Sequence, residues 1–462
     1  MGRPLVVILF CTAMYLTLYR GAVVAFVTLY IPCLLLLNTT QKINIPGAPD
    51  MNATFGVIYG ICGALVMKGG EPMPFKWGWM DTVWCLGALS TVITGMVTEY
   101  VYTGVSVFGE QFLGYLAPYF LARVMFHSPE MRRRALWICV VSAFIIAFFT
   151  LIELRLWPYF LSRTLKSFGL FTGSTGEVLW RFNLMRAQTT FDHPIDMGNS
   201  CLLMGAMIAV FATTTSVGLK NLYVRLALFA SICASFSSLS FTSWVGTFAA
   251  IGGFCILWLL PFTRKILIVG VLGLFCGFAV MTYHLYHVDL DARREQLQED
   301  IGQTAQDSMF VRAMIIQKSM PFAENTGLFG WGTTIRHSQL ALESVDNSYM
   351  LFTMRRGFLF LALFLSIPVV MALRATKAFR RAPSRAQWIP LAVGVSAVLG
   401  IMAAMYTVWF GFAYSVLWTI MVGIVTSMCD VLIGATPPAR RGFEPVMRQP
   451  PYARPAAMMQ GA

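Results

Sequence analysis

The sequence predicts an all-α, polytopic transmembrane helix bundle, and three observations support this fold class. Of its 462 residues, 57% are hydrophobic and 12% are charged, whereas soluble domains carry about 25% charged residues. Apolar runs long enough to cross a bilayer, about 17–25 residues, recur along the whole chain. The runs are continuous and do not alternate with polar residues, which excludes a membrane β-barrel.

The apolar runs define 12 or 13 candidate spans. The first two are short and form either two helices or one broken element, which leaves the count open. The spans cover roughly residues 5–19, 21–37, 53–68, 78–98, 111–126, 135–153, 197–216, 222–240, 243–261, 265–286, 349–373, 387–405 and 407–428.

Basic residues gather in loops that these spans place on one side of the membrane. They are Arg132, Arg133, Arg134, Lys220, Arg264, Lys265, Arg374, Lys377, Arg380, Arg381 and Arg385, with Arg440, Arg441 and Arg448 in the tail. The positive-inside rule makes this side cytoplasmic. It also accounts for the net charge of +13 without nucleic acid as a partner. We therefore expect one transmembrane domain over residues 1–436 and a disordered cytoplasmic tail over residues 437–462.

Neither a disulfide framework nor a metal centre is indicated. The ten cysteines contain no Cys-x-x-Cys pair and nearly all lie inside apolar runs. The N-terminal apolar stretch has no small-x-small cleavage site after it, so we interpret it as mature membrane structure.

Two long loops remain on the outer side, at about residues 154–196 and 287–347. Transporters concentrate function in broken helices at mid-membrane and are built from repeats. No convincing repeat is present here, and most polar chemistry falls in the two outer loops. This distribution favours an enzyme that works at the outer membrane–water interface.

The first outer loop carries basic residues on the side where they are normally sparse. Arg181 and Arg186 directly precede the polar segment Gln188-Thr-Thr-Phe-Asp-His-Pro-Ile-Asp-Met-Gly-Asn199. An arginine can hold a phosphate through two parallel hydrogen bonds. Asp192, His193 and Asp196 do not form a recognised metal site, and His193 is better explained as a hydrogen-bonding residue that orders the turn.

The second outer loop contains Arg312, the run Leu328-Phe-Gly-Trp-Gly332, and Asp346 with Asn347 at the mouth of the next span. A partly desolvated Asp346 would have a raised pKa and could act as a general base. The alternative is that this pair caps the helix.

Arg123 lies near the inner end of its span, where snorkelling to the headgroups explains it. Asp81 and Glu99 likewise lie near span ends. The alternative for these charges is a partner inside the membrane. We keep Arg123 as a candidate substrate-binding residue.

These motifs, in this order, resemble the bacterial O-antigen ligase and O-antigen-type polymerase superfamily, including exopolysaccharide polymerases. Arg186-Ala-Gln-Thr-Thr-Phe-Asp-His-Pro-Ile-Asp-Met-Gly198 resembles the family's Arg, Phe-x-His-Pro and Gly segment. Ser237-Ser-Leu-Ser-Phe-Thr-Ser-Trp-Val-Gly246 resembles its Ser-Arg-Gly-x-Trp-x-Gly helix start. Arg312, the 328–332 run, Asp346-Asn-Ser-Tyr349 and Gly357 are similar to its large periplasmic loop and the helix that follows.

Two positions depart from the family pattern. Phe241 stands where many members have arginine, so one phosphate contact is missing or supplied elsewhere. Asp346 stands where ligases commonly have histidine, which favours a polymerase.

The resemblance implies metal-independent glycosyl transfer between polyprenyl-pyrophosphate-linked glycans in the bacterial inner membrane, with no cofactor. Arg186 and Arg312 would stabilise the leaving pyrophosphate with Arg181 in support, and Asp346 would be the base. Asn347 and His193 would orient a sugar. A chain-length regulator and export proteins are the implied partners.

Two other functions remain open. One is a ligase that transfers glycan to lipid A core or to protein. The other, from a different class, is a flippase or transporter of lipid-linked glycan.

Overall fold

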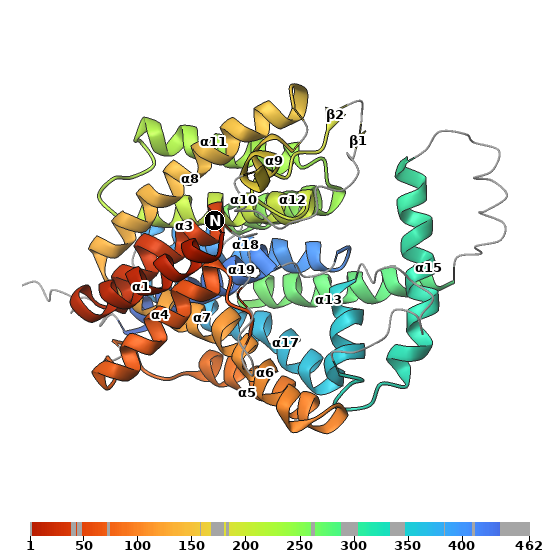
Figure 1. Cartoon of the computed structure of the whole chain (residues 1–462). Coiled ribbons are helices and arrows are strands. Elements are labelled where there is room, and N and C mark those ends of the chain that lie inside the picture. Colours follow the sequence, from red (N-terminus) through yellow and green to blue (C-terminus); the bar gives the residue numbers. More distant parts are fainter. Residues whose placement is uncertain are drawn as a thin grey trace, which may run out of the picture.

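Figure 1 shows the computed structural model of the chain. It describes residues 2–37, 43, 49–71, 74–157, 159–167, 180–181, 184–259, 264–287, 304–332, 347–382, 384–408 and 412–434. Within these ranges nearly all secondary structure is helical, apart from one two-stranded hairpin and an isolated bridge between Ile43 and Met51. The all-α, multi-span architecture predicted from the sequence is confirmed.

In the described part of the chain, eight helices are long and apolar enough to cross a membrane. They are α1 (Gly2–Arg20), α5 (Trp79–Thr98), α8 (Pro129–Arg155), α10 (Pro194–Thr214), α12 (Phe241–Leu259), α17 (Ser348–Arg381), α18 (Arg385–Met405) and α19 (Phe412–Gly434). The described residues also form three shorter apolar helical segments. They are α4 (Ala53–Lys68), α11 (Leu222–Ser237), and the run of α2 (Ala22–Ala25), η1 (Phe26–Tyr30) and α3 (Ile31–Leu36).

The other elements are α6 (Val101–Gln111), η2 (Phe112–Leu116), α7 (Ala117–His127), α9 (Phe160–Ser167), α13 (Arg264–Tyr286) and α15 (Thr304–Glu324), with strands β1 (Trp180–Arg181) and β2 (Leu184–Met185).

Every predicted span falls largely on a helical segment, but several boundaries were wrong. The last predicted span, 407–428, is shifted, because α19 begins at Phe412 and ends at Gly434. The two segments predicted to be outer loops also contain helices that were not predicted: α9 in the first and α15 in the second. Both carry too many polar residues for a sequence search based on long apolar runs to find them.

Both π-helical turns end two residues before a proline, which explains where the helices widen. Pro32 follows η1, and Pro118 follows η2. Proline cannot donate to the carbonyl four residues earlier, and its ring crowds that carbonyl. A π turn absorbs this mismatch without ending the helix.

Helices α10, α18 and α19 are the most buried of the eight and form the centre of the bundle. Helix α12 lies against α18 because small residues meet there. A Cβ added to Gly400 would lie 2.6 Å from the carbonyl oxygen of Gly246, so glycine alone permits this approach. The indole of Trp418 on α19 is fully buried and donates to Val398 O of α18 at 3.2 Å.

The bundle has two chemically different ends. We call the end that holds Arg132, Arg374 and Asp430 the basic end, and the end that holds Glu153 and Asn347 the loop end. Helix α8 runs from one to the other, since the 21 residues between Arg132 and Glu153 span roughly 30 Å. In Figure 1 the loop end faces right, toward β1, β2 and α15.

Candidate functional site

Two arginines are fastened to the loop end by backbone carbonyls. Strands β1 and β2 pair antiparallel, with Arg181 opposite Leu184, and the chain continues into Arg186. Arg181 Nη1 donates to Leu239 O at 2.9 Å, and Arg186 Nε donates to Ser238 O at 3.1 Å. The hairpin therefore places both guanidinium groups over the turn between α11 and α12.

Among the described residues, no carboxylate forms an ion pair with Arg181 or Arg186. Burial and, to a smaller extent, the positive charge of Arg181 together lower the pKa of Arg186 to about 10, against a small opposing effect of Tyr159. Two neighbouring cations with no counter-ion in the described part of the chain favour an anion.

The polar segment after Arg186 is anchored by a buried carboxylate. Glu153, near the end of α8, is 1% exposed. Its Oε2 accepts the backbone N–H groups of Gln188 at 3.0 Å and Thr189 at 2.8 Å. Thr190 Oγ1 donates to Leu35 O at 3.1 Å. These contacts fix the segment against α8 and α3.

The histidine–proline step then starts α10. His193 is the N-cap, and its Nδ1 accepts the N–H of Ile195 at 3.2 Å, so His193 orders this turn as the sequence suggested. Pro194 follows, in the first turn, where a missing N–H costs nothing. The predicted role of His193 in sugar binding stays a prediction.

Buried polar atoms without a partner gather in this same segment. Within the described residues they are Gln188 Nε2, Thr189 Oγ1, Ser200 Oγ, and both side-chain atoms of Asn199. Unpaired buried polar groups are costly, and native proteins contain few of them. Their concentration beside Arg186 marks the place as a candidate ligand site.

Asp196 was not among the predicted site residues, except as a weak metal ligand. It lies in the first turn of α10, is 8% exposed, and accepts the N–H of Tyr414 from the start of α19 at 3.0 Å. This bond gives Asp196 a structural role. No group of three or more His, Cys, Asp or Glu side chains suited to a metal occurs in the described ranges.

The second predicted outer loop, residues 287–347, is described by the structure only in part. Asn347 is 5% exposed and caps α17, since its Oδ1 accepts the N–H of Met350 at 3.1 Å. It also lines a small cavity with Ile315, Tyr406 and Thr407. Asp346, the predicted base, lies outside the described residues. Arg312 lies on α15, but its side chain is also outside them, so its approach to Arg186 stays a prediction.

A short series of hydrogen bonds connects the arginine hairpin with Asn347. Thr242 follows Ser238 and Leu239 at the start of α12, and Thr407 Oγ1 donates to Thr242 Oγ1 at 2.9 Å. Val408 follows Thr407 in the chain, and its carbonyl oxygen accepts a hydrogen bond from the hydroxyl of Ser348. Ser348 is the residue next to Asn347. The starts of α12 and α17 are therefore held together at the loop end.

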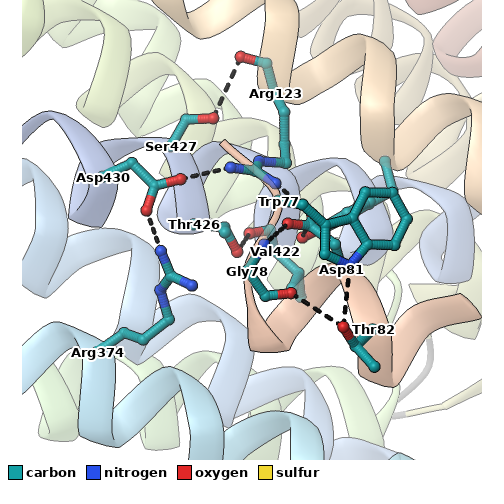
Figure 2. Close-up of polar contacts among 11 residues, drawn as sticks. Trp77, Gly78, Asp81, Thr82, Arg123, Arg374, Val422, Thr426, Ser427 and Asp430 are labelled. Atoms are coloured by element: carbon teal, nitrogen blue, oxygen red, sulfur yellow. Dashed lines mark hydrogen bonds and ion pairs between the residues drawn. The ribbon is translucent and has the colours of Figure 1, made fainter. Parts of the chain in front are cut away.

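Arg123 lies at the opposite, basic end. Figure 2 shows its guanidinium between Asp81 of α5 and Asp430 of α19, and Asp430 also pairs with Arg374 of α17. Tyr119 Oη donates to Asp81 at 2.9 Å. The side chains of Arg123 and Asp81 are both 0% exposed, so the intramembrane partner is the correct explanation and snorkelling is not. Arg123 forms ion pairs with two carboxylates at the basic end, so it is not part of the candidate site around Arg181 and Arg186.

Sequence reasoning missed Asp430, which completes this network. The signal was a single carboxylate at the end of an apolar run, in the last two turns of α19. A charge at this position needs a partner, but the sequence does not show which helix supplies it.

No known family model matches the chain, and no curated protein matches it.

Proposed function

We propose that this chain is a membrane glycosyltransferase of the O-antigen polymerase and ligase type, located in the bacterial inner membrane. It would polymerise polyprenyl-pyrophosphate-linked repeat units at the loop end of the bundle, which would face the periplasm. The observation that carries the proposal is the pair Arg181 and Arg186, held by backbone carbonyls beside a group of unpaired polar atoms.

The contrast between the two ends supports an anionic substrate. At the basic end, Arg123 and Arg374 are neutralised by Asp81 and Asp430. At the loop end, Arg181 and Arg186 have no such partner among the described residues. An enzyme that releases pyrophosphate needs uncompensated cations where the negative charge develops.

The proposed reaction is a displacement at the anomeric carbon of the donor sugar. A sugar hydroxyl oxygen attacks the anomeric carbon of the donor and forms the new glycosidic bond. The bond from that carbon to the pyrophosphate oxygen breaks, and its electron pair leaves with the pyrophosphate. Arg186 and Arg181 would hydrogen-bond the leaving group, and Asp346 would accept the hydroxyl proton. Attack opposite the leaving group inverts the anomeric configuration.

The test is turnover of a polyprenyl-pyrophosphate-linked repeat unit by the purified chain in proteoliposomes. Arg186→Ala should lower the rate about 100-fold or more, because two charge-assisted hydrogen bonds of about 1.5–3 kcal/mol each are lost. Arg181→Ala should lower it about tenfold. Arg155→Ala is the matched control, since Arg155 is an exposed arginine at the same end. Near-normal polymer from the Arg186 variant would overturn the proposal.

A deletion strain separates polymerase from ligase. A missing polymerase leaves single repeat units, whereas a missing ligase leaves long polymer on its lipid carrier. Normal surface glycan and normal lipid-linked intermediates would argue against both.

A further inference from the structure

A third arginine near the loop end of the bundle, Arg356, lines an aromatic cavity. This cavity is a partly open groove between α5, α6 with η2, α17 and α19, and its space is about 480 Å³ when the open side is included. Arg356 is the charged residue in its lining, which is otherwise mostly aromatic and aliphatic and includes Trp84, Phe364 and Trp418. A charge within a membrane span normally pairs or serves a function.

The described residues supply Arg356 with no carboxylate at ion-pair distance. Its guanidinium carbon lies 4.5 Å from the ring centroid of Phe360 and 5.5 Å from that of Phe352. Glu110, which is exposed, and Tyr115 are close enough to act on Arg356 electrostatically. The two rings and a distant carboxylate compensate a desolvated cation only in part.

Neutral donors accompany this cation. Gln111, which is 6% exposed, lines the cavity next to Tyr115. Trp84 lines it too, and its Nε1 is buried without a hydrogen-bond partner among the described residues. A cation with N–H donors suits a phosphate oxygen, and the aromatic remainder suits a hydrocarbon chain.

The position of Arg356 is fixed by a kink in α17. Gly357 has φ +78°, and the residues after it bond to the start of the Leu328–Gly332 run and the residue before it. Phe358 N–H donates to Gly327 O at 3.3 Å, and Leu359 N–H donates to Leu328 O at 3.2 Å. A Cβ on Gly357 would lie 2.2 Å from Leu328 O. The Leu-Phe-Gly-Trp-Gly motif thus holds the kink that places Arg356 in the cavity wall.

We propose that this cavity binds an anionic phospholipid, with Arg356 against the phosphodiester and one acyl chain along the aromatic lining. The number of positive charges that line the cavity favours a lipid with a single negative charge. One arginine matches the single negative charge of phosphatidylglycerol, whereas a pyrophosphate carries more charge and would need further cations. The adjacent Arg355 does not line the cavity. This site is independent of the glycosyltransferase proposal.

The test is native mass spectrometry of the purified full-length chain, delipidated and titrated with phosphatidylglycerol or phosphatidylcholine. Wild type should retain one phosphatidylglycerol in preference to phosphatidylcholine. Arg356→Gln should weaken this binding at least about tenfold, because a charge-assisted contact is lost. Arg225→Gln, at an exposed arginine, should leave it unchanged.

A cavity-filling variant keeps the proposal testable if Arg356→Gln does not fold. A Cβ on Gly87, which lines the cavity, would meet no atom within 4 Å. Gly87→Leu should therefore fill the cavity, preserve the fold and displace the lipid. Gly277→Leu is the control, since Gly277 is equally unobstructed and lies outside the cavity.

Three results would overturn the proposal. They are unchanged phosphatidylglycerol binding in folded Arg356→Gln or Gly87→Leu protein, equal binding of phosphatidylcholine by wild type, and displacement of the phospholipid from wild type by polyprenyl pyrophosphate.

Discussion

Arg186 donates through Nε to the carbonyl oxygen of Ser238 at 3.1 Å, so this cation is fastened to the backbone of the α11–α12 turn. The turn itself is strained, because Leu239 has φ +47°. A charge held in this way is positioned without being neutralised.

Arg186→Gln should stabilise the unliganded protein by about 1 kcal/mol while abolishing ligand stabilisation. Burial and Arg181 lower the pKa of Arg186 to about 10, so folding disfavours its charged form. This cost is fully present below pH 10 and is relieved only as the pH rises above 10, so it acts at neutral pH.

Thermal unfolding in detergent at pH 7.5 measures this effect. Polyprenyl pyrophosphate at about 100 times its Kd should stabilise wild type by about 2.7 kcal/mol and leave Arg186→Gln unchanged. A lower melting temperature for the unliganded variant would instead indicate a purely structural arginine.

Glu153→Gln should loosen the segment that follows Arg186. The carboxylate accepts two backbone N–H groups through Oε2 and a third through Oε1, and an amide offers only one acceptor oxygen. We expect a loss of about 2 kcal/mol in the free energy of unfolding. Hydrogen exchange should accelerate at the amides of Gln188 and Thr189. Glu130→Gln is the control, since Glu130 is an exposed glutamate on the same helix. Unchanged exchange at both amides would contradict the anchoring role.

Asp81→Ala should destabilise the basic end by about 3–5 kcal/mol, because Arg123 would remain buried with half of its compensation. The double variant Asp81→Ala/Arg123→Met should recover much of this loss, since the stranded charge is removed. Glu130→Ala breaks an exposed pair and should cost less than about 0.5 kcal/mol. Melting curves in detergent compare the variants, and a double variant no better than the single would refute the explanation.

Gly357→Ala should destabilise the junction between α17 and the Leu328–Gly332 run. The positive φ alone costs an alanine about 1–2 kcal/mol, and the clash with Leu328 O adds to it. Gly63→Ala is the control, because Gly63 is helical and a Cβ there meets open space. Equal melting temperatures for the two variants would show that the kink is not fixed by this contact.

The span pattern was predictable because each span is a local property of the sequence. A run of apolar residues must become a helix in lipid, whatever it contacts. The weaker predictions concerned helices whose stability depends on neighbours. Helix α15 is one example: it buries Ile315 and Ile316 against α13 and α17, and its own composition gives little sign of this.

For the candidate site, the sequence alone selected Arg181, Arg186 and His193, because arginines beside a histidine–proline step are unusual in a loop predicted to lie on the outer side. It also determined the fold class and the alternation of spans and loops, since hydropathy acts residue by residue along the chain.

Only the tertiary structure decided which charges are paired. Arg123 and Arg356 both belong to apolar helices, yet Arg123 lies between two carboxylates and Arg356 lines an aromatic cavity. The partners come from helices hundreds of residues apart, as in the pair of Arg123 with Asp430. Helix packing determines such a pairing, and no local pattern in the sequence encodes it.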